Sequence, residues 1–133
     1  MADAVSTTVI EDGPRYYTAQ FTNTSDGSGE AAVTKIDVSA LAQTNHGKTC
    51  TGVRISRVWW NTVGMSISML WDATTNVRCL NFKADDEGSL DFNSFDGLQN
   101  YAGTGKTGDV LFTTTGHTNG DTYLVVIEAI KDF

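Results

Sequence analysis

Apolar and polar residues alternate with a period of two along this chain, in short runs that end in glycine-rich turns. In residues 15–24, Tyr17, Ala19 and Phe21 fall on one side of an extended chain, and threonine and glutamine fall on the other. Residues 65–71 alternate in the same way. This period is typical of strands that bury one face. Few segments keep a helical period beyond a turn or two, so the sequence predicts a fold that is nearly all β.

Composition supports this interpretation. The 133 residues include 19 threonines, 13 glycines and a single proline. Threonine favours pleated, half-buried surfaces, and glycine marks the turns between strands. A chain of this length fits one domain and buries about two thirds of the surface that it exposes when unfolded. Neither a disulfide nor a metal is therefore needed to hold the core.

The pattern predicts a single domain over residues 1–133, an antiparallel β-sandwich of eight or nine strands that is jelly-roll-like. We prefer a jelly roll to a closed barrel, and another Greek-key sandwich fits the same strands. Residues 1–12 are either a first strand or an extended N-terminal arm. We expect the last two strands to pair as a hairpin, because the Asn-Gly-Asp sequence between them suits a tight turn. The expected strands are 5–11, 15–24, 32–38, 51–62, 65–71, 77–83, 89–95, 109–115 and 122–131.

The charge balance limits the classes of partner. Nine Lys and Arg residues stand against 16 Asp and Glu residues, which gives a formal net charge of -7 and a pI near 4.5. This balance argues against nucleic acid as the main partner, because phosphate binding needs clustered cations. The N-terminal residues are acidic and no apolar run is long enough to span a membrane, so we expect a soluble protein without a signal peptide that folds inside a cell.

Residues 102–107 look at first like a phosphate-binding loop. That motif needs glycine where this chain has Asn100, and it needs a helix after the threonine. Here a strand is expected to follow. We therefore interpret the segment as an ordinary loop.

No residue pattern predicts a metal site or a catalytic site. His46 and His117 lie in polar runs without the further ligands that zinc requires. The acidic cluster at 85–87 with Asp91 lacks EF-hand spacing, so we interpret it as a solvated turn. A Gly-x-Ser-x-Gly turn is missing, and no two carboxylates stand out as a catalytic pair. The sequence predicts a protein that is not an enzyme, with no catalytic residues, no metal and no cofactor.

The two cysteines, Cys50 and Cys79, are 29 positions apart in strand-like runs without CxxC spacing. We expect both to be unlinked and buried, because free cysteine is among the most buried residue types and a reducing cytoplasm disfavours a structural disulfide.

Trp59 and Trp60 are neighbours in one expected strand, so their side chains must point to opposite faces. One ring enters the core, and the other needs a cover from bulges or loops, from a second subunit, or from a bound sugar. Arg54 and Arg57 lie on the same run, and cations are few in this chain. We expect Arg54, Arg57, Trp59 and Trp60 to contribute to a subunit contact, because tryptophan and arginine are enriched in interface cores.

Three stretches of the chain carry a family resemblance: residues 21–30, then 54–60 with 65–72, and finally 108–114 with 120–123. Together they resemble small β-rich virion structural proteins of tailed bacteriophages, especially those of marine and cyanobacterial hosts. The likeness covers roughly residues 6–131, lies in strand order and turn chemistry, and carries no catalytic motif.

The best-understood small β-sandwich proteins of this kind are capsid decoration, or cement, proteins. The resemblance implies binding to a major capsid protein and to copies of itself as a trimer, with no nucleic acid and no membrane as partner. It implies a location on the capsid surface of the virion, after assembly in the host cytoplasm. A neck, tail or fibre component is an alternative within the virion, and a carbohydrate-binding module is an alternative from another class.

Overall fold

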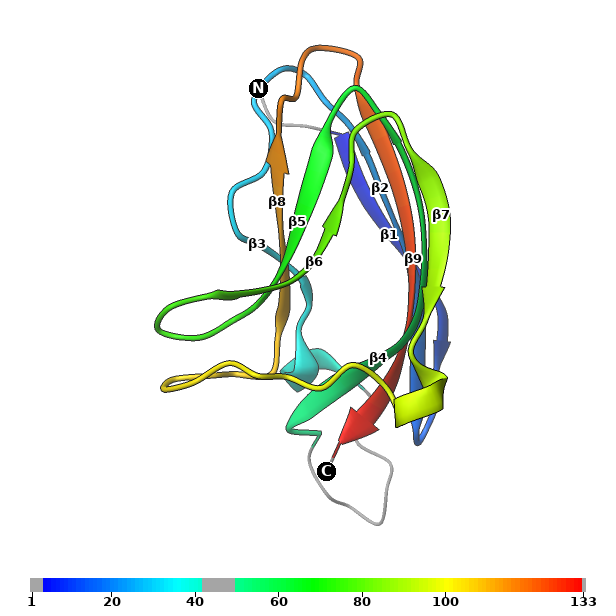
Figure 1. Cartoon of the computed structure of the whole chain (residues 1–133), viewed down its shortest axis with the longest axis vertical. Coiled ribbons are helices and arrows are strands. Elements are labelled where there is room, and N and C mark those ends of the chain that lie inside the picture. Colours follow the sequence, from blue (N-terminus) through cyan, green and yellow to red (C-terminus); the bar gives the residue numbers. More distant parts are fainter. Residues whose placement is uncertain (1–3, 42–49, 133) are drawn as a thin grey trace.

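Two antiparallel sheets face each other in the computed structural model, which describes residues 4–41 and 50–132 (Figure 1). The five-stranded sheet has the order β1-β2-β9-β4-β7, and the four-stranded sheet has the order β3-β8-β5-β6. The prediction of an all-β sandwich is confirmed. The strands are β1 (Ala4–Asp12), β2 (Tyr16–Thr24), β3 (Val33–Ile36), β4 (Gly52–Val63), β5 (Ser66–Trp71), β6 (Val77–Phe82), β7 (Glu87–Asp91), β8 (Val110–Thr115) and β9 (Thr122–Asp132).

The strand pairing is that of a jelly roll. Strand β5 pairs with β6, β4 with β7, β3 with β8 and β2 with β9, all of them antiparallel. The chain is therefore one long hairpin, centred between β5 and β6, that has rolled over itself into two sheets. The pairs β4–β9 and β5–β8 join the successive windings within each sheet. Strand β1 is an addition to the eight strands of the roll.

The expected hairpin of the last two strands is wrong. Strand β8 lies in the four-stranded sheet and β9 in the five-stranded sheet, so residues 116–121 cross from one layer to the other. This crossing is held by the segment after β2: Gly120 N donates to Ser25 O (2.8 Å), and Ser25 N donates to Asp121 O (2.7 Å). Turn-forming residues mark where the chain reverses, but they do not determine which sheet receives the next strand.

Residues 4–12 form an edge strand and not an arm. Strand β1 pairs with β2 from Ala4 to Asp12, with one bulge between Val9 and Glu11. The strand expected over residues 89–95 is displaced: β7 ends at Asp91, and Asn93–Phe95 form a 3-10 turn. A second 3-10 turn, at Val38–Ala40, follows β3, which ends at Ile36 and not at residue 38 as expected.

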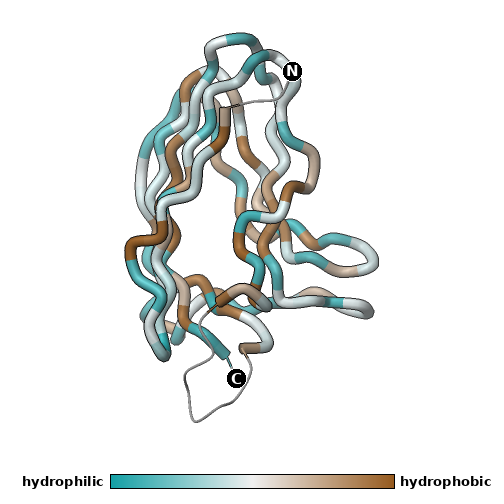
Figure 2. Tube along the Cα trace, turned by 180° about the vertical axis from the view of Figure 1, so that it is seen from behind, coloured by the Kyte–Doolittle hydropathy of each residue, from teal (hydrophilic) through white to brown (hydrophobic). Residues whose placement is uncertain are grey.

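The core lies between the sheets and is built from the alternating side chains. Figure 2 shows apolar and polar residues alternating along the strands. Phe112 from the four-stranded sheet meets Phe21 and Tyr123 from the five-stranded sheet edge-on, with ring centroids 5.7 Å apart in both pairs. Trp71 is fully buried. These contacts across the layers fix how the two sheets face each other.

Candidate subunit interface

A bulge in β4 sets which of its side chains face outward. The register of β4 against β9 shifts between Ile55 and Arg57, so Ser56 is an extra residue whose side chain is buried. Its hydroxyl contacts Asn93 Oδ1 (2.7 Å) and Glu128 Oε1 (3.1 Å). Residues three apart in a regular strand face opposite sides, but the bulge places Arg54 and Arg57 on the same outer face.

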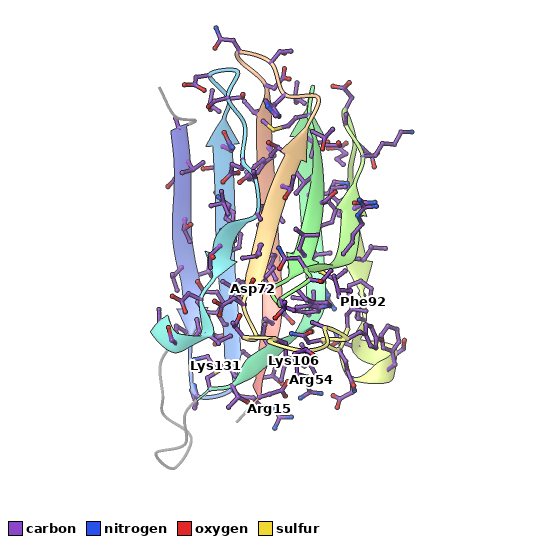
Figure 3. The ribbon with its side chains drawn as sticks, turned by 90° about the vertical axis from the view of Figure 1, so that its left-hand side faces the viewer. Arg15, Arg54, Asp72, Phe92, Lys106 and Lys131 are labelled. Atoms are coloured by element: carbon purple, nitrogen blue, oxygen red, sulfur yellow. The ribbon has the colours of Figure 1, made fainter. Side chains whose placement is uncertain are left out.

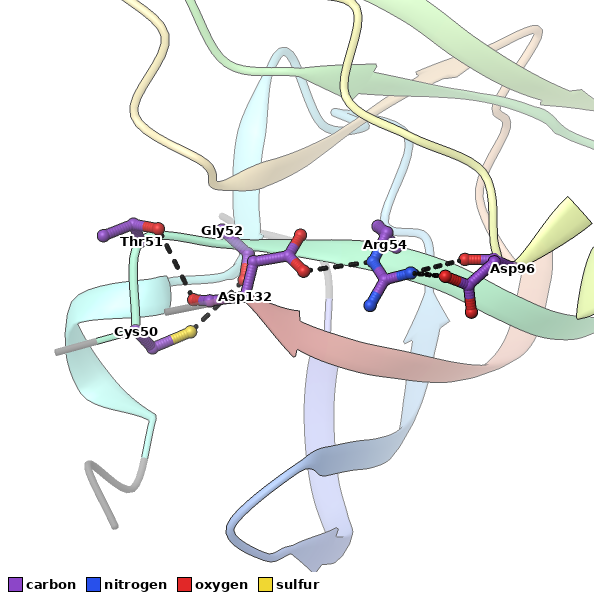
Figure 4. A network of polar contacts seen from close by, with 6 residues as sticks. All are labelled: Cys50, Thr51, Gly52, Arg54, Asp96 and Asp132. Atoms are coloured by element: carbon purple, nitrogen blue, oxygen red, sulfur yellow. Dashed lines mark hydrogen bonds and ion pairs between the residues drawn. The ribbon is translucent and has the colours of Figure 1, made fainter. Parts of the chain in front are cut away.

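Arg54 binds two carboxylates of its own chain (Figure 4). Its Nη1 lies 2.6 Å from Asp96 Oδ2 and 2.7 Å from Asp96 O, and its Nε lies 3.0 Å from Asp132 Oδ1. Burial opposes the charged form, but the hydrogen bonds and ion pairs with Asp96 and Asp132 outweigh it and raise the pKa of Arg54. Arg54 therefore ties the end of β9 to the loop after β7.

Arg57 and Trp59 form a unit on the outer face of the five-stranded sheet. The guanidinium of Arg57 lies 5.6 Å from the centroid of the Trp59 ring, and its Nη2 lies 2.9 Å from Asp91 Oδ2 on β7. Both members of this ion pair are about half exposed. Arg57 thus holds the tryptophan ring on the sheet and leaves the unit at the surface.

Trp60 points to the opposite side of β4, as expected for adjacent residues of a strand. Its ring stacks on Phe82 of the other sheet, with centroids 5.0 Å apart, and its Nε1 donates to Asp86 Oδ2 (3.4 Å). Gly88 lies opposite Trp60 on β7, and a Cβ there would lie 3.0 Å from the ring. Trp60 therefore packs against the core and closes one side of the sandwich.

The same outer face carries a continuous area without charged side chains, here called the uncharged face. Trp59 lies beside Val126 of β9, which lies beside Gln20 of β2; in the next row, Leu124 lies between Asn61 and Thr22. In a chain of which 19% is charged, such an area fits an interface core, because interface cores are depleted of charge. Its members are Ser6, Thr8, Gln20, Thr22, Thr24, Trp59, Asn61, Val63, Thr122, Leu124 and Val126.

A shallow hollow of about 290 Å³ lies within the uncharged face. It is lined by side chains of β2, β4 and β9, among them Thr22, Asn61 and Leu124. Charged residues of the outer face lie beyond it: Glu128 and Arg57 in the row below Trp59, and Glu87 on the edge strand β7. The structure thus brings Arg57 and Trp59 to the border of this face. Arg54 lies farther from it, opposite Ile130 near the end of β9, and Trp60 lies on the core-facing side of β4.

The other candidate segments serve the fold. In the part of the chain that the structure describes, no group of three or more His, Cys, Asp or Glu side chains is placed to hold a metal ion. Asp85 Oδ1 accepts from Gly64 N (2.8 Å), which joins two loops. His117 Nδ1 contacts Thr114 Oγ1 (3.3 Å), and His46 lies outside the described residues.

Across the ranges 4–41 and 50–132, no helix has the length and apolarity to cross a membrane.

Residues 102–107 form a loop and not a phosphate-binding turn before a helix. The loop lies against the turn between β5 and β6, and the two project together from the four-stranded sheet (Figure 1). Thr74 N donates to Thr104 O (3.1 Å), and Thr107 N donates to Asp72 O (3.2 Å). Gly105 permits this contact, since a Cβ there would lie 2.2 Å from Thr74 Oγ1.

Both thiols are free in the structure, as expected. Cys50 is buried as expected, with Sγ 3.3 Å from Gly52 O, whereas Cys79 is only partly buried, with Sγ 3.2 Å from Met69 O. Burial raises the pKa of Cys50, and it raises the pKa of Cys79 to about 12. Both groups are therefore neutral thiols near pH 7 and not reactive thiolates.

Sequence reasoning missed a buried polar cluster between the sheets. Glu30 and Lys35 form an ion pair of 2.5 Å with side chains only 5% and 6% exposed. The carboxylate of Glu30 also accepts from Tyr123 Oη (2.5 Å) and from Asn23 Nδ2 (3.0 Å). Glu30 and Lys35 look like surface charges in the sequence, and only the folding of the β2–β3 loop over the end of the sandwich buries them.

Comparisons of the chain with protein-family models, with curated proteins and with solved structures gave no match.

Proposed function

We propose that this protein is a structural subunit of a tailed-phage virion, of the capsid decoration type, that attaches to the head shell through the uncharged face. The observation that carries the proposal is this face itself, with Trp59 at its border. The likeness to phage virion proteins supplies the setting. Binding only the assembled shell would stabilise the shell by mass action, and particle symmetry would multiply each contact.

The physical argument concerns desolvation. Burying a charge without a partner is costly, whereas threonine, asparagine and glutamine side chains can exchange hydrogen bonds with water for hydrogen bonds with a partner. The uncharged face therefore loses little on contact and gains from the apolar area of Trp59, Leu124, Val126 and Val63. The charged remainder of the acidic chain then faces solvent.

A sugar-binding platform is less well supported by the same residues. Such a platform stacks a pyranose on an open aromatic face, but Arg57 lies over the Trp59 ring. A neck, tail or fibre component would use the same face, and it differs from a decoration protein in copy number.

Counting and locating the copies tests the proposal. Quantitative mass spectrometry of purified virions of the phage that encodes this chain should find hundreds of copies per particle, and image reconstruction should place them on the head. A low copy number fixed by tail symmetry, with density at the neck or tail, would overturn the decoration role. Absence from purified virions, together with glycan binding by the isolated chain, would overturn the structural role altogether.

A further inference from the structure

The four edge strands of the two sheets differ in how well they are protected against pairing with another chain. Edge strands are usually short, charged or bulged, because unpaired backbone groups attract further strands. Strand β7 has five residues with Glu87 and Asp91 at its ends, and β3 has four residues and a bulge. Strand β6 carries Arg78 and a bulge against β5. These three edges follow the rule.

Strand β1 is protected only at its C-terminal end, where a bulge lies between Val9 and Glu11 and the strand closes with Glu11 and Asp12. It has nine residues, all exposed, and its first seven, Ala4 to Ile10, carry no charge. Three of these seven are Val5, Val9 and Ile10, and neither lysine nor proline interrupts the strand. Within the described residues, its side away from β2 has no strand partner.

The inner face of β1 is also uncovered. Val5 and Val9 lie opposite Asn23 and Ala19 of β2, which are buried, so they share the core-facing side of the sheet. They are nevertheless 50% and 53% exposed. Figure 3 shows the reason: β1 lies at the margin of the five-stranded sheet, beyond the edge of the four-stranded sheet in front of it.

We infer that β1 is a dimerisation edge, at which the β1 strands of two copies pair antiparallel and join the five-stranded sheets into one. In a two-fold pair of this kind, opposed residues face the same side of the sheet. Centring the pair on Thr7 sets Val5 of each copy opposite Val9 of the other. The uncovered valines then form one apolar cluster, and Ala4 lies opposite Ile10.

The spacing of the exposed valines favours a second copy as the occupant, because Val5 and Val9 are equally far from Thr7 and each covers the other in a two-fold pair. The chain carries a net charge of -7, so most contacts between two copies are repulsive. The register centred on Thr7 opposes only uncharged residues over the segment from Ala4 to Ile10. A shift by two residues towards the C-terminal end of β1 would set Glu11 opposite Val5 and lose the valine pairing.

The solution mass of the purified chain tests the inference. Light scattering should give the mass of two 14.3 kDa chains for the wild type and of one chain for Val9→Lys, because a lysine opposite Val5 at this edge blocks pairing. Val63→Lys is the matched control: Val63 is equally exposed, 53%, but lies at the end of β4, and this variant should stay dimeric. A monomeric or trimeric wild type, or a dimeric Val9→Lys variant, would overturn the inference.

A second experiment checks the register without disturbing the fold. Thr7→Cys should form a disulfide-linked dimer on mild oxidation, because the two Thr7 residues face each other across the axis. Thr34→Cys, an exposed position on β3, should not. Failure of Thr7→Cys to cross-link in a dimeric sample would overturn the register.

The inference is independent of the proposed function: Val63→Lys should weaken virion binding and keep the dimer.

Discussion

Trp59 and Trp60 illustrate at the scale of single residues how neighbouring side chains of one type serve different surfaces. Trp60 stacks on Phe82 between the sheets, whereas Trp59 lies under Arg57 on the outer face. The alternation of a strand predicts this division from sequence. It does not predict which of the two enters the core, because that depends on the bulge at Ser56, and the sequence carries no mark of the bulge.

Replacing each tryptophan by alanine should separate the two roles. Trp60→Ala removes a ring packed against the core, and we expect the free energy of unfolding to fall by about 3 kcal/mol. Trp59→Ala removes an outer ring and its cation–π contact, which costs about 1 kcal/mol or less. Urea unfolding measures both. Equal losses in the two variants would contradict the assignment of the rings.

The thiol of Cys79 predicts a dependence of stability on alkaline pH. An unfolded thiol has a pKa of about 8.5, and burial raises the pKa of Cys79 to about 12 in the folded chain. The stability contributed by the neutral buried thiol is therefore complete below pH about 8.5 and is lost as the pH rises towards 12. The loss is up to about 1.4 kcal/mol per pH unit.

Urea unfolding at a series of pH values from about 8 to 11 measures this loss, with Cys79→Ala as control. The variant lacks the titrating group, so its stability should fall less steeply than that of the wild type. Parallel slopes for the two proteins would contradict the raised pKa. Titration of the denatured, unreduced chain should find both thiols reactive.

At the scale of strands and loops, sequence reasoning succeeded where the signal is local. Residues such as Ile67 and Met69 alternate with serine, and β5 forms where that pattern predicts it. The pairing of strands depends on contacts between distant segments, so the same reasoning assigned β8 and β9 to a hairpin that does not exist. The end of β7 was missed for a related reason, since Phe92 and Phe95 belong to a turn whose rings pack on each other.

The buried cluster at the β2–β3 loop gives a prediction at this scale. Lys35→Ala leaves the Glu30 carboxylate buried without its cation, and we expect a loss of about 3–5 kcal/mol in the free energy of unfolding. Adding Glu30→Gln should restore much of the stability, because the amide still accepts from Tyr123 and carries no charge. Thermal unfolding of the single and double variants measures this. If the double variant is no more stable than Lys35→Ala, the ion pair does not account for the loss.

At the scale of the whole molecule, the jelly roll presents two outer sheet faces of different character. The five-stranded sheet offers the uncharged face and the open β1 edge, whereas the four-stranded sheet carries the projecting loops around Thr74 and Thr104. The sequence predicts one sandwich and marks Trp59 and Arg57 as interface candidates. It does not reveal the uncharged face, because residues from β1, β2, β4 and β9 come together only in the folded sheet.

The most direct test of the central claim places one charge in the uncharged face. Thr22 lines the hollow beside Leu124, and Thr34 is an exposed threonine on β3 of the other sheet, so Thr22→Glu and Thr34→Glu are a matched pair. Binding of each purified variant to virions stripped of this protein is measured by co-sedimentation. The account predicts at least about a thirtyfold loss of affinity for Thr22→Glu, equivalent to about 2 kcal/mol, and wild-type binding for Thr34→Glu. Wild-type binding by a folded Thr22→Glu variant would contradict the claim that this face makes the contact.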